Sequence, residues 1–365
     1  MTKQFKAFYK LSIILLAALA AMLLGALVLW TIGADVTKTY SVILLEPLKN
    51  TMQIGEVLIR AIPLTIIALG ISVAYRSGII NIGAEGQMAI GILAATAVAL
   101  ALPGLPKAVL LPLAMIAGTL GGAAWGFIPG VLKAKLHVSE LLSTVMLNYI
   151  AAQFYTFCLR GPMLDPAEIT MGSGTPQSMR LTRAVWLDRL VPGTRIHSGA
   201  YLAIALAFLI WLLLWKTSWG YKMRAAGASE RAARYGGIGV AGYLVVAMMI
   251  SGAFAGLAGA VEIAGVHRRA IEGVTSGYGF SGIIVALFGG LHPAGILPAS
   301  FFFGLLIVGA DMTQRMVGVP ANMVLVLQGI IILVIVATRM VLANPYLMER
   351  TWRRYRKLTH SDKEE

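Results

Sequence analysis

Long apolar runs separated by short polar segments extend through almost the whole chain. A helix needs about 20 mostly apolar residues to cross a membrane. Candidate runs lie at about residues 11–32, 53–75, 79–101, 109–132, 140–159, 199–216, 242–265, 281–292, 294–313 and 319–342. The run at 281–292 is too short to cross alone, so it either starts earlier, within Ser276–Phe280, or belongs to a broken helix. The pattern predicts an all-α polytopic membrane protein with about ten transmembrane helices.

Composition agrees with a chain that lies largely in a bilayer. Of its 365 residues, 58% are hydrophobic and 13% are charged, whereas a soluble domain carries about 25% charged residues. The net charge of +14 comes from Lys and Arg clusters between the apolar runs. A nucleic-acid-binding protein would instead carry basic stripes on a soluble surface. The lipid bilayer is therefore an expected partner, and nucleic acid is not.

The basic clusters predict the orientation of the chain. Lys and Arg gather in cytoplasmic loops, and they do so here when both the N- and C-termini are cytoplasmic. The run Leu11–Trp30 is longer than the apolar core of a signal peptide, so we interpret it as a retained first span. Two external segments oppose the bias: residues 160–198 contain five arginines, and residues 266–280 contain Arg268 and Arg269.

Two glycine-rich segments resemble each other. Met115–Ala124 and Met249–Ala258 share Met, Ile, two Gly and one Ala at equivalent positions. Each contains Gly-x-x-x-Gly, which lets helix backbones approach closely. The residues expected at these helix contacts are Gly118, Gly122, Gly252 and Gly256. Either the chain contains an internal repeat, as many transporters do, or these are two ordinary tightly packed helices.

Polar residues interrupt two of the apolar runs. Asn81–Met88 opens the third run, and a Glu at the centre of a span costs about 2.5–3.5 kcal/mol. Asn81 and Glu85 are four residues apart, so a helix places them on one face. Glu85 either lines a polar translocation path or is satisfied by Arg76 or by a helix N-terminus near the cytoplasm. Asn148, in the fifth run, either lines the path or hydrogen-bonds a neighbouring helix.

Two connections between the runs have distinctive sequences. Residues 227–237 predict a short separate helix on the cytoplasmic side, because Ser229 is a good N-cap and Glu230 suits the first turn. Gly236 or Gly237 can end that helix in the left-handed conformation. This segment either docks a partner or is a solvated connector. The connection at 160–198 is long for a loop, and it either receives an external partner or is a variable surface loop.

Sequence motifs for catalysis are absent. The chain contains no G-x-x-x-x-G-K-[ST], so it is not expected to bind ATP through a P-loop. No nucleophile elbow or zinc-site motif stands out, and the single cysteine, Cys158, rules out a disulfide or a cysteine metal site within the chain. The chain is therefore not expected to be an enzyme. Active transport would draw its energy from an ion gradient or from another chain.

Five segments, taken in order, resemble one family of transporters. They are IINIGAEGQ (79–87), IPGVLKAK (128–135), STVMLNYI (143–150), AARYGGI (232–238) and GYGFSGIIVAL (277–287). Together they resemble the permeases of ABC importers in the ribose, branched-chain amino acid and nucleoside group. The resemblance is closest to the nucleoside or simple-sugar branch. Gly290–His292 departs from the pattern, since family members often have a more polar run before the following proline.

The resemblance implies a complex of several subunits in a bacterial inner (plasma) membrane. This chain would be a single transmembrane permease domain, 1–365, without a cofactor of its own. Its partners would be a second, paralogous permease, two cytoplasmic ATPase subunits that bind ATP and magnesium, and an extracytoplasmic substrate-binding protein. The parts of the chain would be the first span (1–32), a first repeat half (53–160), an extracytoplasmic loop (161–198), a second repeat half (199–342) with a cytoplasmic coupling segment (222–240), and a basic cytoplasmic tail (343–365).

The resemblance also implies roles for individual residues. Those near the translocation path would be Asn81, Glu85, Gln87, Asn148 and Phe280. Those coupling the permease to an ATPase would be Gly227, Ser229, Glu230, Arg231, Ala232, Tyr235 and Gly236. The expected function is a path for a nucleoside or a simple sugar, and the alternative is an ion-coupled secondary transporter that uses Glu85. The solute, and whether the two permeases are identical or different, stay open.

Overall fold

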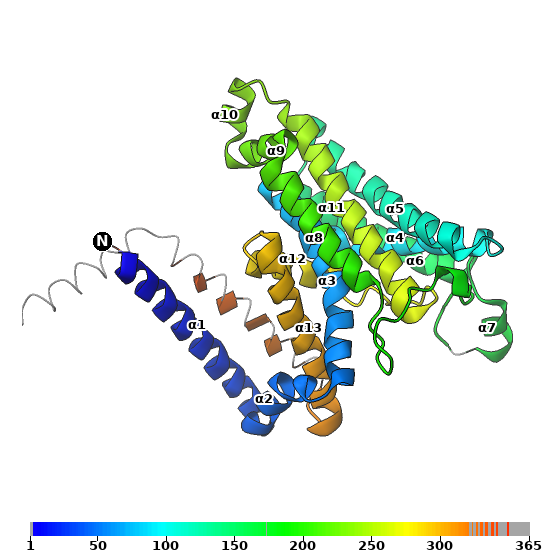
Figure 1. Cartoon of the computed structure of the whole chain (residues 1–365), viewed down its shortest axis with the longest axis horizontal. Helices are drawn as coiled ribbons and strands as arrows, with labels where there is room; N and C mark the ends of the chain where they lie inside the picture. The colour runs from blue at the N-terminus through cyan, green and yellow to red at the C-terminus, as the bar shows by residue number, and fades with distance from the viewer. Residues whose placement is uncertain are drawn as a thin grey trace, which may run out of the picture. The chain divides into compact units, whose positions relative to one another are not determined.

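The computed structural model describes residues 3–172 and 174–320 and, beyond them, single positions up to residue 349. The regular elements in these ranges are helices (Figure 1). In chain order they are α1 (Lys3–Thr31), α2 (Val36–Leu44), α3 (Thr51–Arg76), α4 (Ala84–Ala101), α5 (Lys107–Leu136), α6 (Glu140–Arg160), α7 (Pro166–Met171), α8 (Gly199–Lys216), α9 (Ser218–Ala228), α10 (Glu230–Tyr235), α11 (Val240–Glu262), α12 (Tyr278–Phe288) and α13 (Pro293–Met316). Short 3-10 turns lie at Glu46–Leu48 and Arg183–Val185, and a π-helical turn at Ile263–His267 extends α11.

Seven helices within the described residues are long and apolar enough to cross a membrane. They are α3, α4, α5, α6, α8, α11 with its π-helical turn, and α13. Each coincides with one of the predicted runs, so the prediction of an all-α polytopic membrane protein is confirmed. α12 is short, as predicted for the run at 281–292. The expected last span, 319–342, and the tail, 343–365, lie outside the described residues apart from single positions, so the count of ten spans stays a prediction.

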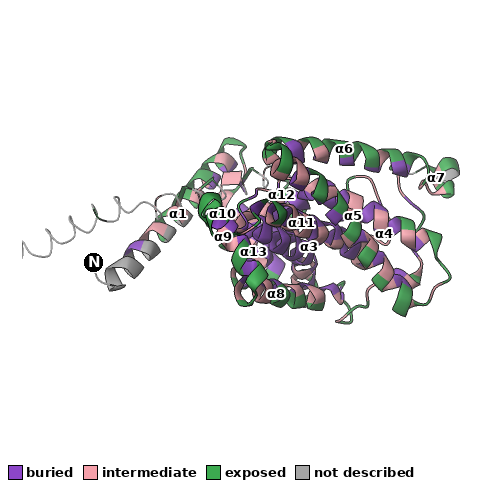
Figure 2. Cartoon of the chain, turned by 90° about the horizontal axis from the view of Figure 1, so that it is seen from above, coloured by how far each residue is buried: buried purple, intermediate pink, exposed green. Residues whose placement is uncertain are grey.

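Residues 49–307 form one compact unit, and the chain up to Leu48 forms a second unit with the chain from Val308 onward. In the larger unit, α3 is central, since 89% of its most apolar stretch is buried, against 28% for α5 and 33% for α6 and α8. Buried residues concentrate in α3 and α11, while exposed residues line α6 (Figure 2). The apolar outer faces of α5, α6 and α8 are therefore available to lipid or to another subunit.

The smaller unit contains a contact between α1 and α2. The Tyr40 hydroxyl of α2 donates a hydrogen bond of 2.7 Å to the carbonyl oxygen of Met22 in α1. The N-cap residue of α2 is Asp35, whose carboxylate accepts a hydrogen bond from the backbone N–H of Lys38 (2.9 Å). This carboxylate satisfies one of the free N–H groups in the first turn of α2.

Three helices of the larger unit meet at glycines. Gly118 and Gly122 of α5 lie against Gly252 and Gly256 of α11, and a methyl group added at Gly122 would overlap the carbonyl oxygen of Gly252. α4 joins the same contact through Gly91, which lies against Gly256. Lipid gives little hydrophobic driving force between helices, so close packing at small residues holds them together. The two segments that resemble each other in sequence thus pack on each other, while their origin as a repeat stays a prediction.

We expect Gly122→Ala to destabilise the protein by about 1–3 kcal/mol, because the new methyl group meets backbone atoms that cannot rotate away. Gly242→Ala is the matched control, since Gly242 lies in α11 with open space where a side chain would be. That substitution should be neutral or stabilising by up to about 1 kcal/mol. Thermal unfolding in detergent, followed by size-exclusion chromatography, measures both. Equal melting temperatures for the two variants would contradict the tight contact.

Candidate functional site

The short helix α12 lies in the larger unit, packed against α3 and α4. Eleven residues of α-helix rise only about 17 Å, against a hydrocarbon core of about 30 Å. α12 follows Gly277, which has a φ of +76°, and it ends at Gly289. Free N–H and C=O groups at its two ends would be costly in a membrane, so they need partners from the protein.

Glu85 supplies the partner at the N-terminus of α12. One carboxylate oxygen accepts a hydrogen bond from the N–H of Gly277 (3.0 Å) and the other from that of Gly279 (2.7 Å). Glu85 lies in the first turn of α4, and Gly279 packs on its backbone so closely that no side chain would fit there. The N-termini of α4 and α12 therefore meet at one carboxylate, whose negative charge suits both helix dipoles. Of the two alternatives for Glu85, the geometry shows contact with a helix N-terminus.

Backbone N–H groups of residues 289–291 satisfy the last carbonyl groups of α12, and Arg76 binds the turn that these residues form. Its guanidinium donates to the carbonyl oxygens of Leu291 (2.6 Å) and Gly290 (3.3 Å). The same group lies 4.6 Å from the centre of the Trp215 ring. A cation at a C-terminus and an anion at an N-terminus both stabilise a helix. Thus α12 is held at its two ends by opposite charges that come from either side of the connection between α3 and α4.

Asparagine side chains hold the N-terminus of α4. Asn148 of α6 accepts a hydrogen bond from the N–H of Gly86 and donates one to the carbonyl oxygen of Ile82, both at 2.9 Å. It therefore does the work of an N-cap side chain that Gly83 lacks. Asn81 lies beside it, and its amide donates to Gln87 and to Ser251 of α11, both at 2.8 Å.

The structure brings the five predicted path residues to this junction of α4, α6 and α12. Asn81 and Gln87 are buried within the chain, Asn148 is 9% exposed, and Glu85 is partly buried. Phe280, in the first turn of α12, is 47% exposed. Three of the five thus make hydrogen bonds inside this chain with little open surface, and the aromatic ring of Phe280 is the member that faces outward.

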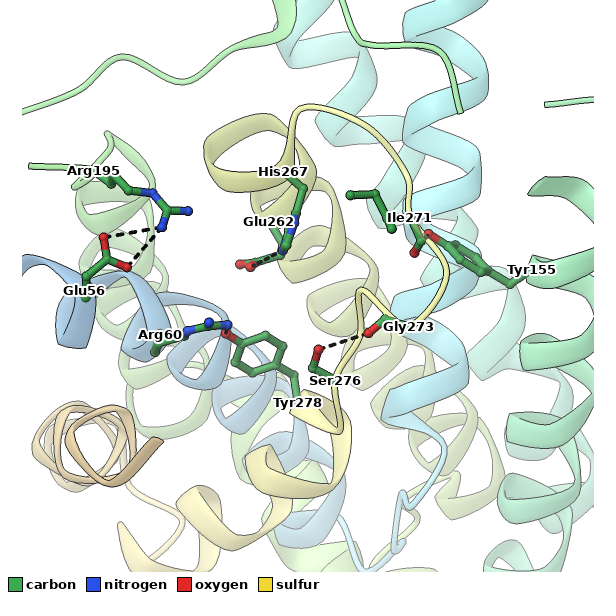
Figure 3. Close-up of polar contacts among 10 residues, drawn as sticks. All are labelled: Glu56, Arg60, Tyr155, Arg195, Glu262, His267, Ile271, Gly273, Ser276 and Tyr278. Carbon is green, nitrogen blue, oxygen red and sulfur yellow. Dashed lines mark hydrogen bonds and ion pairs between the residues drawn. The ribbon is translucent and has the colours of Figure 1, made fainter. Parts of the chain in front are cut away.

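A second polar cluster was missed by the sequence reasoning (Figure 3). Arg60 of α3 donates a hydrogen bond of 3.0 Å to the hydroxyl of Tyr278 in α12. Glu262, 1% exposed near the end of α11, has a carboxylate oxygen 3.4 Å from the Nε2 atom of His267. Both charged residues lie in apolar runs, where an ionisable side chain marks a functional position by default. That signal was present at Arg60 and Glu262 but was applied to Glu85 alone.

His197 lies beside this cluster, just before α8. Its Nδ1 atom accepts a hydrogen bond from the N–H of Gly199 (3.2 Å). Burial lowers the pKa of this imidazole, the Glu262 carboxylate opposes that change, and Arg195 adds to it. Among the described residues, no group of three or more His, Cys, Asp or Glu is arranged to hold a metal ion.

The predicted short helix is present as α10. Ser229 caps it by accepting a hydrogen bond from the N–H of Ala232 (3.4 Å). Glu230 and Arg234 form an ion pair of 2.6 Å along its surface. Its last residue, Tyr235, is 98% exposed. The seven predicted coupling residues lie in this helix or directly beside it: Gly227, Ser229, Glu230, Arg231, Ala232, Tyr235 and Gly236.

The segment before α10 contacts the end of α3. Gly227 packs directly on the carbonyl oxygen of Arg76 and on the backbone of Gly78. Gly78, with a φ of +84°, turns the chain at the end of α3. The last turn of α9, just before α10, therefore touches Arg76, which also binds the turn after α12.

The outer face of α6 carries a shallow, wide-open aromatic hollow, formed by side chains of this one helix. Its volume is about 500 Å³, and it is lined by Tyr149, Ile150, Gln153, Phe154 and Phe157. Tyr149 and Phe157 are each 66% exposed. A glutamine among exposed aromatic rings is unusual on a face that meets lipid alone, because an unpaired amide is costly there.

Comparison with known proteins decides the class of the chain. Residues 53–336 match a family described as the branched-chain amino acid transport system, permease component. The chain belongs to this permease family. This permease is 34% identical to the guanosine ABC transporter permease protein NupP of Bacillus subtilis, over 89% of its own length and 92% of NupP.

Two further relatives agree. The permease is 34% identical to the glucose ABC transporter permease protein TsgB13 of Haloferax volcanii, over 88% of its own length and 86% of TsgB13. It is 32% identical to the guanosine ABC transporter permease protein NupQ of Bacillus subtilis, over 68% of its own length and 78% of NupQ. The resemblance to ABC permeases is thus confirmed, and the alternative of an ion-coupled transporter that uses Glu85 is not favoured.

We expect Glu85→Ala to destabilise the N-terminal turn of α12 by about 1–3 kcal/mol, because two backbone N–H groups lose their acceptor. Glu85→Gln keeps one acceptor oxygen but loses the charge, so its effect should be smaller. Hydrogen exchange of the peptide covering residues 275–284 measures the local change. Glu140→Ala is the control, since Glu140 is an N-terminal helix residue of α6 that pairs with Lys133. Unchanged exchange in Glu85→Ala would contradict the cap.

Proposed function

We propose that this permease forms one side of the translocation path of an ABC importer for a nucleoside or a simple sugar. The named activities of NupP and TsgB13 support those two solute classes. We also propose that ATP hydrolysis takes place in two cytoplasmic ATPase subunits and that an extracytoplasmic binding protein delivers the solute. Two permeases named for guanosine occur in one bacterium and both match this chain, which supports a second, paralogous permease as the partner.

The proposed topology has about ten spans, both termini in the cytoplasm of a bacterial cell, and two related halves at 53–160 and 199–342. The segment 222–240 would then lie on the cytoplasmic side and 161–198 outside. Basic residues near α9 and α10 support this orientation, because Lys and Arg favour cytoplasmic loops. The basic tail, 343–365, would share that side.

The observation that carries the coupling role is the exposed tip of α10. A capped helix of six residues ends in a tyrosine with almost its whole surface open, and tyrosine is a frequent centre of protein interfaces. Movement of α10 would reach Arg76 through Gly227, and Arg76 holds the end of α12. The proposed route therefore links the ATPase contact to the helix that carries Phe280.

We expect Tyr235→Ala to weaken co-purification of the ATPase subunits by about tenfold, as loss of a central interface aromatic typically does. Solute uptake should fall with it, while insertion of the permease stays normal, because Tyr235 packs on little of its own chain. Tyr201→Ala is the matched control, since Tyr201 of α8 is also well exposed, at 66%, but lies at the opposite end of its helix from α9. ATPase recovery equal to that of the unmodified protein would exclude Tyr235 from the coupling contact.

The hollow on α6 supports a nucleoside over a sugar. Aromatic side chains stack on nucleobases with about 1–3 kcal/mol per base, and a glutamine amide can pair with a base edge. In the proposed complex this face would be turned towards the path. Sugars could use the same amide but would gain less from four neighbouring apolar side chains.

We expect Phe157→Ala to reduce uptake of labelled guanosine by about fivefold or more, because a stacking surface is lost. Phe208→Ala is the control, since Phe208 of α8 is similarly exposed, at 60%, and lies outside the hollow. Uptake is measured in cells that carry the complete transporter. If glucose competes with guanosine as well as unlabelled guanosine does, or if both variants transport normally, the α6 face is not the nucleoside contact.

A further inference from the structure

Four arginines gather at one place on the segment proposed to lie outside the membrane. Arg180, Arg183 and Arg189 come from the long connection between α6 and α8 and are exposed, and Arg268 follows the π-helical turn of α11. We call these four residues the arginine surface. We propose that the arginine surface is the docking site for an acidic, carboxylate-bearing face of an extracytoplasmic protein, which in the proposed function is the substrate-binding protein.

A tryptophan organises the arginine surface. The guanidinium of Arg268 lies 3.9 Å from the centre of the Trp186 ring, and those of Arg180 and Arg183 lie at 5.2 and 5.9 Å. The ring is itself fixed, because its N–H donates a hydrogen bond of 3.0 Å to the carbonyl oxygen of Leu181. Cation–π contact holds guanidinium planes in place while leaving their N–H groups open to an anion.

The segment that carries these residues is tied to the end of α11. Leu181 donates a backbone hydrogen bond to Arg268 (2.8 Å), and Leu187 donates one to Ala264 (3.1 Å). Ser178 donates to Ala270 through its N–H (2.9 Å) and accepts from Ala270 through its hydroxyl (3.0 Å). The positive groups are therefore positioned before any partner arrives, which reduces the ordering cost of binding.

Holding these arginines together is costly in the isolated chain. Burial lowers the pKa of Arg268, and the positive charges of Arg189, Arg180, Arg195 and Arg183 lower it further. Arg268 also has a φ of +61°, a conformation that a residue with a side chain rarely adopts. Strain and like-charge repulsion of this kind persist where a function uses them.

Neighbouring carboxylates do not neutralise the arginine surface. Asp188 pairs with Lys107, Glu56 with Arg195, and Glu272 with Arg160. Within the described part of the chain, none of the four arginines has a carboxylate within ion-pair distance. The positive-inside tendency would also remove cations from this side of the membrane. The positive charge of the arginine surface can therefore pair with carboxylates of a partner.

The chemistry favours a protein as that partner. Three of the four arginines come from the middle of the segment 161–198, whereas cations that bind lipid headgroups usually flank the spans directly. Arginine and tryptophan are the side chains enriched at the centres of protein interfaces, and arginine matches carboxylates with paired hydrogen bonds. A rigid set of several guanidiniums suits several carboxylates on one folded surface.

The test uses the full transporter in nanodiscs of neutral phosphatidylcholine, with fluorescein-labelled hexaglutamate as the probe. The unmodified protein should bind the peptide saturably, and binding should weaken steeply as salt rises. The triple variant Arg180→Gln, Arg183→Gln, Arg189→Gln should bind at least about tenfold more weakly. The corresponding triple lysine variant keeps the charge but loses the paired geometry, so it should fall between the two.

Lys38→Gln is a control for the removal of exposed positive charge, because Lys38 is exposed on α2 and would lie on the same side of the membrane in the proposed topology. It should bind the peptide as the unmodified protein does. Equal peptide binding by the unmodified protein and the triple glutamine variant would overturn the proposal. Binding that needs phosphatidylglycerol vesicles, with no affinity for the peptide, would overturn it too and would assign the surface to lipid.

This inference rests on the proposed function only for the identity of the partner. The peptide measurement needs neither ATP nor a solute, so it can fail while guanosine uptake succeeds. Conversely, a chain that binds the peptide through its arginines but transports nothing would contradict the proposed function alone. In an active transporter, the triple glutamine variant should lower uptake at least about fivefold at limiting solute while ATPase subunits still co-purify.

Discussion

A helix that stops inside a membrane must have its free backbone groups satisfied by the protein, and α12 shows how this chain does so. Glu85 binds N–H groups at one end, and at the other end the following turn satisfies the C=O groups while Arg76 binds that turn. The two residues flank the short connection between α3 and α4, so this part of the chain and α12 fix each other's position. The bilayer offers no water to replace either partner. The N-terminus of α4, the first turn of α12 with Phe280, and Asn148 of α6 meet at this place.

The same stretch also contacts the segment that contains α9 and α10. Gly227 packs on the backbone of Arg76 and Gly78, and α10 follows within a few residues. In the proposed coupling, a displacement of the α9–α10 segment would act on Arg76, which binds the turn after α12. The proposed coupling needs no long chain of side chains, because one arginine belongs to both contacts.

Local sequence signals predicted the parts of this structure that depend on neighbours in the chain. The cap at Ser229, the apolar spans and the short run at 281–292 could all be inferred, because each depends on residues a few positions apart. For Glu85 a helix N-terminus, and for Asn148 a neighbouring helix, were among the expected partners, but the particular groups that they bind were not identified. Arg76 and Leu291 are separated by 215 positions, and Arg60 and Tyr278 by 218, and a single sequence contains no record of which distant residues pair.

The glycine contact among α4, α5 and α11 determines where this unit can change shape. At that contact backbone lies on backbone, so there are no side-chain rotamers that could absorb sliding between the three helices. They form a stiff frame. The left-handed turns at Gly277 and Gly290, on either side of α12, lie outside the frame and have no side chain to restrict rotation. Any pivoting of α12 against this frame would therefore have to break, or carry along, its hydrogen bonds to Glu85 of α4.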